Sequence, residues 1–470
     1  MQKFLTLFLS LVFSCFFMFE STALAEESVD LAAESVEEDA YVPPQLLRCF
    51  YTDREKLERI EEAGIDLKCT GHGPGYVDVI VEAGDFQRKD HPANKLLSKF
   101  PRVDVRYPNL DLMAERFREK EDLGLYHTFD EVKEKLKAAV AEHGNLGQLH
   151  VLGKSREGRN VYALKLSDNV SQDEGEAAFL ICGMHHAREW ISVDVVMAFM
   201  ERLLNGYSKE SRIKKILDER EIWLVPVQNP DGYVYSTTEY RMWRKNRAKN
   251  SDGSRGVDPN RNYRYHWGEA GASSWPSSNT YRGPGAASEP ITQIIQEFAA
   301  GHENLVGSIS FHSYGELILW PWSYTRETCP DNDVLAPMGR DMAKFNGQSP
   351  KQSTNLYPSS GDFDDYMYGV CGLASYTFEL AHSFIPDEDK IEPICQKNVK
   401  ALLWFVENAA DPFPILKHRT LGATSGEGPY EVEVTYDESH DTDFGLRGVE
   451  LLWRSKDKDY ERTGMTRGRG

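Results

Sequence analysis

The sequence predicts an α/β fold with a mixed, mainly parallel central sheet and helices on both sides of it. Between about residues 126 and 411, short apolar segments that suit strands alternate with longer segments of helical periodicity. The strand candidates are mostly apolar, as strands buried on both faces are, and helices separate them along the chain. In such a sheet the functional side chains are expected at strand ends along one edge. The strand candidates are residues 161–166, 177–182, 222–227, 305–311 and 375–380, and the helix candidates are 192–204, 289–300 and 392–409.

The first 25 residues have the organisation of a secretory signal peptide. Lys3 provides a positive start, residues 5–19 are apolar, and Ala23 and Ala25 form an A-x-A cleavage site. Cys15 allows lipid attachment as an alternative, although the apolar stretch continues beyond it. Because the apolar run is short for a membrane span, we expect a mature protein that is secreted, extracellular or periplasmic, with no membrane association after signal removal.

The next two segments differ from each other in composition. Residues 26–44 read as a solvated acidic linker. Residues 45–124 are expected to form a small ferredoxin-like α+β domain with its connector, because strand and helix patterns alternate there. In the connector, residues 113–122 are highly charged and contain Arg116, Arg118 and Lys120, which suit a trypsin-like activating cut; a charged solvated helix is the alternative. The domain's strand candidates are residues 46–51, 76–81 and 103–107, and its helix candidates are 53–63 and 95–100.

Charge and cysteine content limit the function classes. The formal net charge of -20 argues against a nucleic-acid partner, because phosphate binding needs a basic surface. An even number of cysteines in an exported chain favours disulfides, and Cys49 with Cys69 is one candidate pair since both lie in the small domain. The absence of a CxxC pattern argues against a cysteine-bound structural zinc. The six cysteines after the signal are Cys49, Cys69, Cys182, Cys329, Cys371 and Cys395.

After residue 411 the pattern changes again. Residues 428–436 and 449–453 read as strands, and only about three strands fit before the basic, Gly-rich end. Residues 412–470 are therefore expected to be a partial β-module or tail, and residues 125–411 the domain that carries the function.

Three side chains from two distant segments suit a catalytic zinc ion. His186 and Glu189 follow the strand candidate at 177–182 and are three residues apart, so one turn places both on the same side. His312 follows another strand candidate and is the natural third ligand; catalytic zinc takes three protein ligands and keeps an open position. His185 is the alternative to His186, because its spacing of four to Glu189 also suits a helix.

Several motifs occur in the order seen in funnelin-type metallocarboxypeptidases, the relatives of pancreatic carboxypeptidases A and B. The resemblance covers roughly residues 126–411 and implies one zinc ion per catalytic domain and peptide or protein C-termini as substrate. Residues 45–110 resemble the activation segment of that family by pattern, and we expect a monomer. The motifs are His186-Ala-Arg-Glu189, Arg241-Met-Trp-Arg244, Asp258-Pro-Asn-Arg-Asn262, His312-Ser-Tyr314, Tyr357 and Tyr376-Thr-Phe-Glu-Leu380.

The resemblance also implies roles for individual residues. Glu379 becomes the general base and Arg244 the group that stabilises the tetrahedral oxyanion. Asp258 is a candidate hydrogen-bond acceptor for the second nitrogen of His186. The alternative is that Asp258 and Pro259 only form a turn, and both can hold together. A cis peptide is expected between Ser313 and Tyr314. The residues implied to bind substrate are Asn260, Arg261, Tyr357 and Arg188.

The position that corresponds to the bottom of the side-chain pocket in the family is Asp364. A buried carboxylate without a counter-ion is costly, so such a pocket is expected to prefer Lys or Arg at the substrate's C-terminus. Asp362 and Phe363 replace small residues of the usual loop, so Asp362 as the floor, and broad specificity, stay open.

Other readings use the same fold or the same residues. An amidohydrolase of small N-acyl amino acids is disfavoured by Asn260, Arg261 and Tyr357 beside Glu379. A peptidoglycan-trimming carboxypeptidase stays open, and a non-catalytic binding module is disfavoured because no ligand and no base is missing.

Overall fold

The computed structural model describes residues 45–50, 72–73, 76–81, 98, 100–107, 123–172, 174–409, 416–418, 434–436, 449–453 and 461–465. Within residues 123–409 an eight-stranded sheet has the order β11-β10-β12-β9-β7-β8-β6-β5. Its strands are β5 (Gly147–Lys154), β6 (Asn160–Leu166), β7 (Ala177–Cys182), β8 (Arg220–Val225), β9 (Leu305–Ser313), β10 (Leu317–Trp320), β11 (Ser349–Gln352) and β12 (Ala374–Leu380).

The predicted mixed sheet is confirmed. The four central strands β12, β9, β7 and β8 run parallel, β10 and β6 flank them in antiparallel orientation, and β11 and β5 form the edges. β7 is buried along nearly its whole length, which explains why its sequence is uncharged throughout. β12 is also buried along its whole length, although it contains Glu379.

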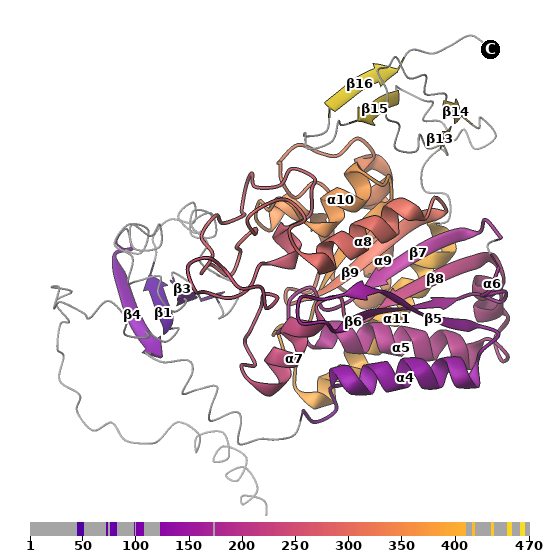
Figure 1. Cartoon of the computed structure of the whole chain (residues 1–470), viewed down its shortest axis with the longest axis horizontal. Coiled ribbons are helices and arrows are strands. Elements are labelled where there is room, and N and C mark those ends of the chain that lie inside the picture. Colours follow the sequence, from indigo (N-terminus) through magenta and orange to yellow (C-terminus); the bar gives the residue numbers. More distant parts are fainter. Residues whose placement is uncertain are drawn as a thin grey trace, which may run out of the picture. The chain divides into compact units, whose positions relative to one another are not determined.

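Helices cover both faces of this sheet (Figure 1), with α4 and α5 along one face and α8 along the other. α11 packs against α5 and α9. The helices are α4 (Phe129–Glu142), α5 (Ile191–Gly206), α6 (Ser211–Glu219), α7 (Pro230–Thr238), α8 (Pro290–Gly301), α9 (Asn332–Asn346), α10 (Phe363–Gly369) and α11 (Glu388–Asn408), and short 3-10 turns span Pro259–Arg261 and Ser353–Asn355.

Local sequence signals fix where several helices begin. Thr128 and Glu131 form a capping box at α4, in which the Glu131 N–H donates to Thr128 Oγ1 (3.1 Å) and the Thr128 N–H to Glu131 Oε2 (2.7 Å). Asn229 caps α7, whose first residue is Pro230, and Asp362 caps α10. The last two caps start helices that border the functional site.

The predicted central elements agree with the observed ones to within a few residues, but several elements were not assigned from sequence. β10 and β11 have four residues each, and α10 has seven, too few for a clear periodicity. β5 is an edge strand with an exposed valine, so it lacks the apolar run of a buried strand.

The segments outside this unit are smaller. β1 (Gln45–Phe50), β2 (His72–Gly73), β3 (Tyr76–Val81) and β4 (Arg102–Tyr107) form an antiparallel sheet of order β2-β3-β1-β4, in agreement with three predicted strands. β13 (Leu416–His418) pairs with β14 (Val434–Tyr436), and β15 (Val449–Trp453) with β16 (Glu461–Met465). The signal peptide, the acidic linker, the predicted helix at 53–63 and the basic connector fall outside the described residues. So does the predicted helix at 95–100, except for Ser98 and Phe100.

The disulfide prediction is wrong for four cysteines. Cys182, Cys329, Cys371 and Cys395 are free thiols. They lie on separate elements: the end of β7, the loop before α9, the turn after α10 and the middle of α11. Cys49 is buried in β1, and its predicted partner Cys69 lies outside the described residues.

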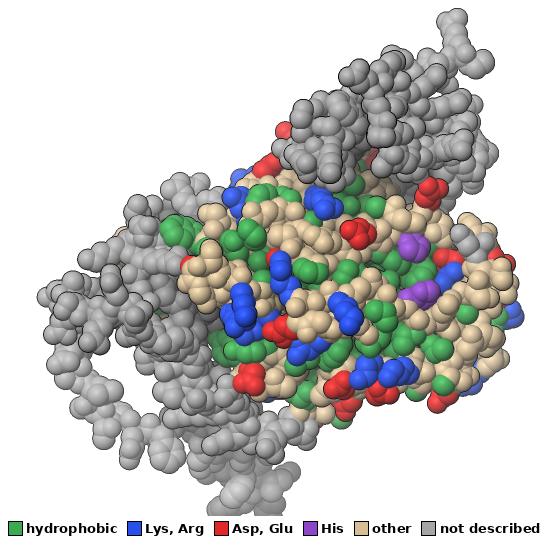
Figure 2. Space-filling view, in the orientation of Figure 1, with side chains coloured by type: hydrophobic (Ala, Val, Ile, Leu, Met, Phe, Trp, Pro, Cys, Tyr) green, Lys and Arg blue, Asp and Glu red, His purple; other side chains and the backbone are tan. Residues whose placement is uncertain are grey.

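In the part of the chain that the structure describes, no helix combines the length and the apolar character that a bilayer span requires. On the face shown in Figure 2, basic and acidic side chains are intermixed.

Candidate active site

The loop between β7 and α5 brings His186 and Glu189 together. Gly183 starts the loop where a Cβ atom would lie 2.7 Å from the Ser192 carbonyl oxygen, so the close approach requires glycine. Ser192 Oγ donates to the Glu189 carbonyl (2.6 Å) and accepts from the Met184 N–H (3.0 Å), which ties the loop to the first turn of α5. His186 Nδ1 then lies 2.9 Å from Glu189 Oε1.

His312 completes this group from the end of β9. Its Nδ1 lies 2.9 Å from Glu189 Oε2 and 3.1 Å from His186 Nδ1, and the three residues are 1–3% exposed. Tetrahedral zinc with bonds of about 2.0–2.1 Å separates neighbouring ligand atoms by about 3.3 Å, close to these distances. Burial alone would raise the pKa of Glu189, but the two imidazoles outweigh it and hold that pKa well below its usual value. Two imidazoles and an ionised carboxylate therefore fit a zinc ion.

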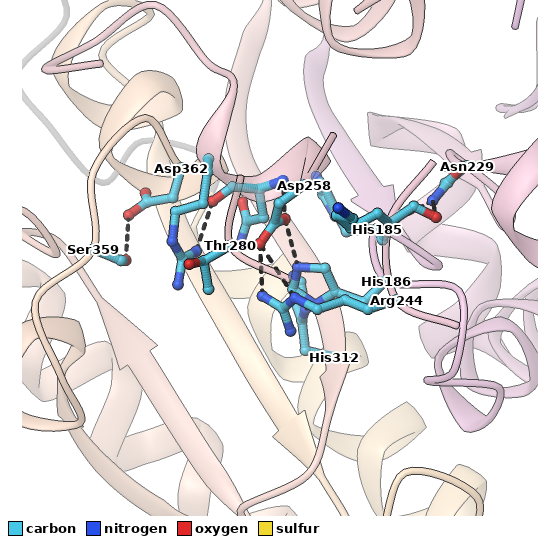
Figure 3. A network of polar contacts seen from close by, with 12 residues as sticks. His185, His186, Asn229, Arg244, Asp258, Thr280, His312, Ser359 and Asp362 are labelled. Atoms are coloured by element: carbon cyan, nitrogen blue, oxygen red, sulfur yellow. Dashed lines mark hydrogen bonds and ion pairs between the residues drawn. The ribbon is translucent and has the colours of Figure 1, made fainter. Parts of the chain in front are cut away.

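Asp258 connects this group to Arg244 (Figure 3). Its Oδ1 lies 3.1 Å from His186 Nε2, and its Oδ2 accepts from Arg244 Nε (3.2 Å) and Nη2 (2.9 Å). Burial would raise the pKa of Asp258, but the charges of Arg244 and His186 outweigh it and keep that pKa well below normal. An ionised Asp258 accepts the Nε2 proton of His186, which leaves the Nδ1 lone pair facing Glu189 and His312.

His186, not His185, lies in the group that could hold the metal ion. His185 Nδ1 lies 2.9 Å from Ser310 Oγ and its Nε2 3.0 Å from the Tyr263 hydroxyl, so both nitrogens point away from Glu189. Burial, followed by the nearby His312 and His186, lowers the pKa of His185 well below its usual value. The predicted cis peptide between Ser313 and Tyr314 is also confirmed, and a second one links Pro321 and Trp322.

The register of β9 and β12 places Glu379 beside His312. These strands are parallel, with Glu379 opposite His312, so both side chains project to the same face. Serines, a threonine, His312 and Glu379 alternate with apolar residues on these two strands. We call this set the polar stripe: Ser308, Ser310 and His312 on β9 with Ser375, Thr377 and Glu379 on β12.

Arg261 and its neighbours border the site. Arg261 is buried, and its Nε donates to the Gly271 carbonyl (2.8 Å) and its Nη1 to the Asn260 carbonyl (2.7 Å). Its guanidinium carbon lies 5.8 Å from the ring centre of Tyr357. Asn260 Oδ1 accepts from the Phe363 N–H (2.9 Å), so the arginine-bearing turn is attached to α10. Arg188 is also buried, and its guanidinium carbon lies 4.1 Å from the ring centre of Phe384.

Three buried acids at the start of α10 have different surroundings. Asp362 accepts from the Asp365 N–H (2.9 Å) and Ser359 Oγ (3.0 Å), as a helix cap does. The carboxylate of Asp365 accepts from the Ser323 and Tyr324 N–H groups (2.9–3.0 Å). Asp364 faces the polar stripe.

Asp364 accepts a hydrogen bond from Ser375 Oγ (3.0 Å). Its burial, followed by the charge of Asp362, raises its pKa to about 8, while hydroxyl donors of Thr377 and Ser375 oppose the rise. The side chain of Asp364 thus faces the side of β12 that carries Glu379, and it is hydrogen-bonded to hydroxyl groups there.

Asn229 was not singled out from the sequence, yet it connects the segment that carries His186 to the segment that carries Arg244. Its Nδ2 donates to the carbonyls of His185 (3.0 Å) and Lys245 (3.3 Å), next to His186 and Arg244 in the chain (Figure 3). Its Oδ1 accepts from the Gly232 N–H (3.1 Å). The only sequence signal was its position before Pro230, which marks a helix cap.

The fold and this donor set define a mononuclear zinc hydrolase, and comparisons with known proteins name its family. The family model described as zinc carboxypeptidase matches residues 132–401. A zinc carboxypeptidase of Saccharothrix mutabilis subsp. capreolus is 37% identical over 313 residues, which cover 63% of this chain and 72% of that protein. Carboxypeptidase A1 of Bos taurus is 34% identical over 295 residues, 60% of this chain and 70% of that protein.

A solved structure agrees in fold. The crystal structure of carboxypeptidase A from Helicoverpa armigera superposes with a TM-score of 0.65 at 23% identity, covering 78% of this chain and 98% of that one. The family model and the two relatives show that the chain belongs to the zinc carboxypeptidase family, and it is a zinc-dependent peptide hydrolase.

Proposed function

We propose that this enzyme removes C-terminal residues from peptides outside the cell, with a preference for lysine and arginine. In this proposal His186, Glu189 and His312 hold the single zinc ion. When bound, zinc lowers the pKa of a water molecule and polarises the scissile carbonyl. The buried carboxylate of Glu189 and the tautomer fixed by Asp258 support this ligand set.

Glu379 is the proposed general base. Its place opposite His312 in the β9–β12 register supports a position from which it takes a proton from the attacking water. The same carboxyl then delivers that proton to the leaving nitrogen. Arg244 is the proposed oxyanion donor, and its bonds to Asp258 support a fixed orientation before substrate arrives.

Arg261, with Asn260 and Tyr357, is the proposed binding site for the substrate's terminal carboxylate. A guanidinium meets a carboxylate through two charge-assisted hydrogen bonds, and an internal peptide bond offers no carboxylate there. The bonds of Arg261 to the Gly271 and Asn260 carbonyls support a rigid guanidinium. Arg188 is assigned to substrate residues further from the C-terminus.

The preference for basic residues rests on one observation: Asp364 is buried on the polar stripe, where Ser375 and Thr377 supply hydroxyl donors. A buried carboxylate gains most from a cationic partner. Asp362, the alternative floor, already caps α10 and binds Ser359, so its oxygens are used within the loop. A protonated Asp364 also accepts apolar side chains, and this favours broad specificity as the second candidate at acidic pH.

The test compares kcat/KM for hippuryl-Arg and hippuryl-Phe at pH 8.5 (a value chosen above the pKa of about 8). The unmodified enzyme is expected to favour hippuryl-Arg, and Asp364→Asn to lose that preference while hippuryl-Phe is still cleaved. Asp389→Asn, the same change at an exposed site on α11, is the control. Equal or better cleavage of hippuryl-Phe by the unmodified enzyme would end the basic-pocket proposal.

Export and activation form the other part of the proposal. Residues 1–25 support secretion, and the basic connector with Arg116 and Arg118 supports activation of a monomeric zymogen by a trypsin-like cut. Activity is expected to rise after limited trypsin treatment of the full chain. Full activity of the uncut chain at the outset would contradict the zymogen.

A further inference from the structure

His185 is not one of the three proposed zinc ligands, but its side chain has contacts on several sides. It is fully buried, it precedes His186, and its backbone carbonyl accepts from Asn229 Nδ2 (3.0 Å). Its ring contacts Phe363 edge-on, with centroids 5.3 Å apart. A buried histidine with this many partners has a fixed ring orientation.

Both ring nitrogens have hydrogen-bond partners. Nδ1 lies 2.9 Å from Ser310 Oγ, and Nε2 lies 3.0 Å from the Tyr263 hydroxyl, which also accepts from Gln228 Nε2 (2.9 Å). A neutral imidazole suits this arrangement because it offers one donor and one acceptor. Replacing the ring by an apolar one would leave buried hydroxyl groups of two separate elements with fewer partners.

The ring of His185 also stacks on His312. Their centroids are 5.1 Å apart and their planes differ by 19°. Ser310, the partner of His185 Nδ1, lies two residues before His312 on β9 and therefore projects to the same face of the sheet. One side chain thus contacts the strand that carries His312 at two points, while its own backbone adjoins His186.

We propose that His185 is a positioning residue for the zinc site: it holds the His312 ring in its ligating orientation by stacking on it and by its hydrogen bond to Ser310. The proposal rests on the zinc ligand set given above. Residues outside the ligand set act in this way elsewhere, and their removal typically weakens metal binding about 10- to 100-fold.

Matched serine substitutions on β9 provide the test. Ser310→Ala removes the bond to His185, whereas Ser308→Ala removes a bond to Ser375 Oγ (2.9 Å) on the same strand and face, without contact to His185. The rate of zinc transfer from each holoenzyme to a chromogenic chelator is measured. Ser310→Ala and His185→Phe are expected to accelerate zinc release roughly 10-fold or more. Ser308→Ala is expected to release zinc at a rate within about twofold of that of the unmodified enzyme. Ser310→Thr keeps a hydroxyl group and is expected to retain the slow zinc release of the unmodified enzyme.

A second readout separates positioning from general loss of stability. The visible absorption of the cobalt-substituted enzyme is expected to change in Ser310→Ala and not in Ser308→Ala, because only the first alters a ligand's surroundings. Unchanged zinc release in Ser310→Ala, or equal acceleration in both alanine variants, would overturn the role of His185 and leave the ligand set intact. An unmodified enzyme without bound zinc would overturn both.

Discussion

The ionisation of Asp364 is expected to make substrate preference depend on pH. Its pKa is raised from 3.8 to about 8, and at about 1.4 kcal/mol per pKa unit the charged form is disfavoured by roughly 6 kcal/mol in the substrate-free pocket. With this pKa, about 1% of the carboxyl is ionised at pH 6 and about half at pH 8. A cationic side chain binds the ionised form, so kcat/KM for hippuryl-Arg follows that fraction.

The ratio of kcat/KM for hippuryl-Arg to that for hippuryl-Phe is therefore expected to rise on the order of 50-fold between pH 6 and pH 8, and to level off above pH 8. The ratio cancels pH effects that both substrates share, such as those of the zinc site. Asp364→Asn is expected to give a flat ratio, and Asp389→Asn the profile of the unmodified enzyme. A pH-independent ratio in the unmodified enzyme would refute a titrating Asp364 in the pocket.

Three further predictions concern the same site. Glu379→Gln is expected to lower kcat by about 10²- to 10⁴-fold with one zinc still bound, checked by kinetics and metal analysis; loss of the metal along with activity would contradict a pure base role. Arg261→Ala is expected to remove about 1.5–3 kcal/mol of discrimination between a free C-terminal acid and its amide, measured as the ratio of their kcat/KM values; an unaltered ratio would remove Arg261 from the proposed carboxylate site. Asp364→Asn is expected to raise the unfolding temperature relative to the unmodified protein, because a carboxyl whose folded-state pKa lies above its unfolded value destabilises the fold above about pH 4. The gain in unfolding temperature is absent near pH 4, grows with pH and is complete above about pH 8. An equal gain at about pH 4 and about pH 9 would rule out this cause.

The central sheet was predictable where strands are apolar on both faces. β7 was predicted with its observed bounds, since a run of six uncharged, mostly apolar residues is typical of a strand buried on both faces. β10 and β11 were not predicted, because four residues are too few to show the alternation of a strand. Pro350 within β11 also argues against a strand at that position. Short strands of this kind form because neighbouring strands supply their hydrogen bonds, which is a property of the whole sheet.

The site was predictable in its residues and less so in its arrangement. The spacing of His186 and Glu189 already indicated a shared side, but the alignment of Glu379 with His312 follows from the register of two strands more than sixty residues apart. The polar stripe was visible in the sequence as alternating serines and a threonine among apolar residues, a pattern that a search for buried strands passes over. The partners of His185 come from β9 and from the Tyr263 loop, so no local pattern indicated them.

The central claim is that His186, Glu189 and His312 hold a single zinc ion beside Glu379. The most direct measurement is an anomalous difference map from crystals of the purified enzyme, with data collected on both sides of the zinc absorption edge. One peak in contact with all three side chains is the predicted result. A peak at another place in the chain, or no peak in an enzyme that still cleaves its substrate, would contradict the claim.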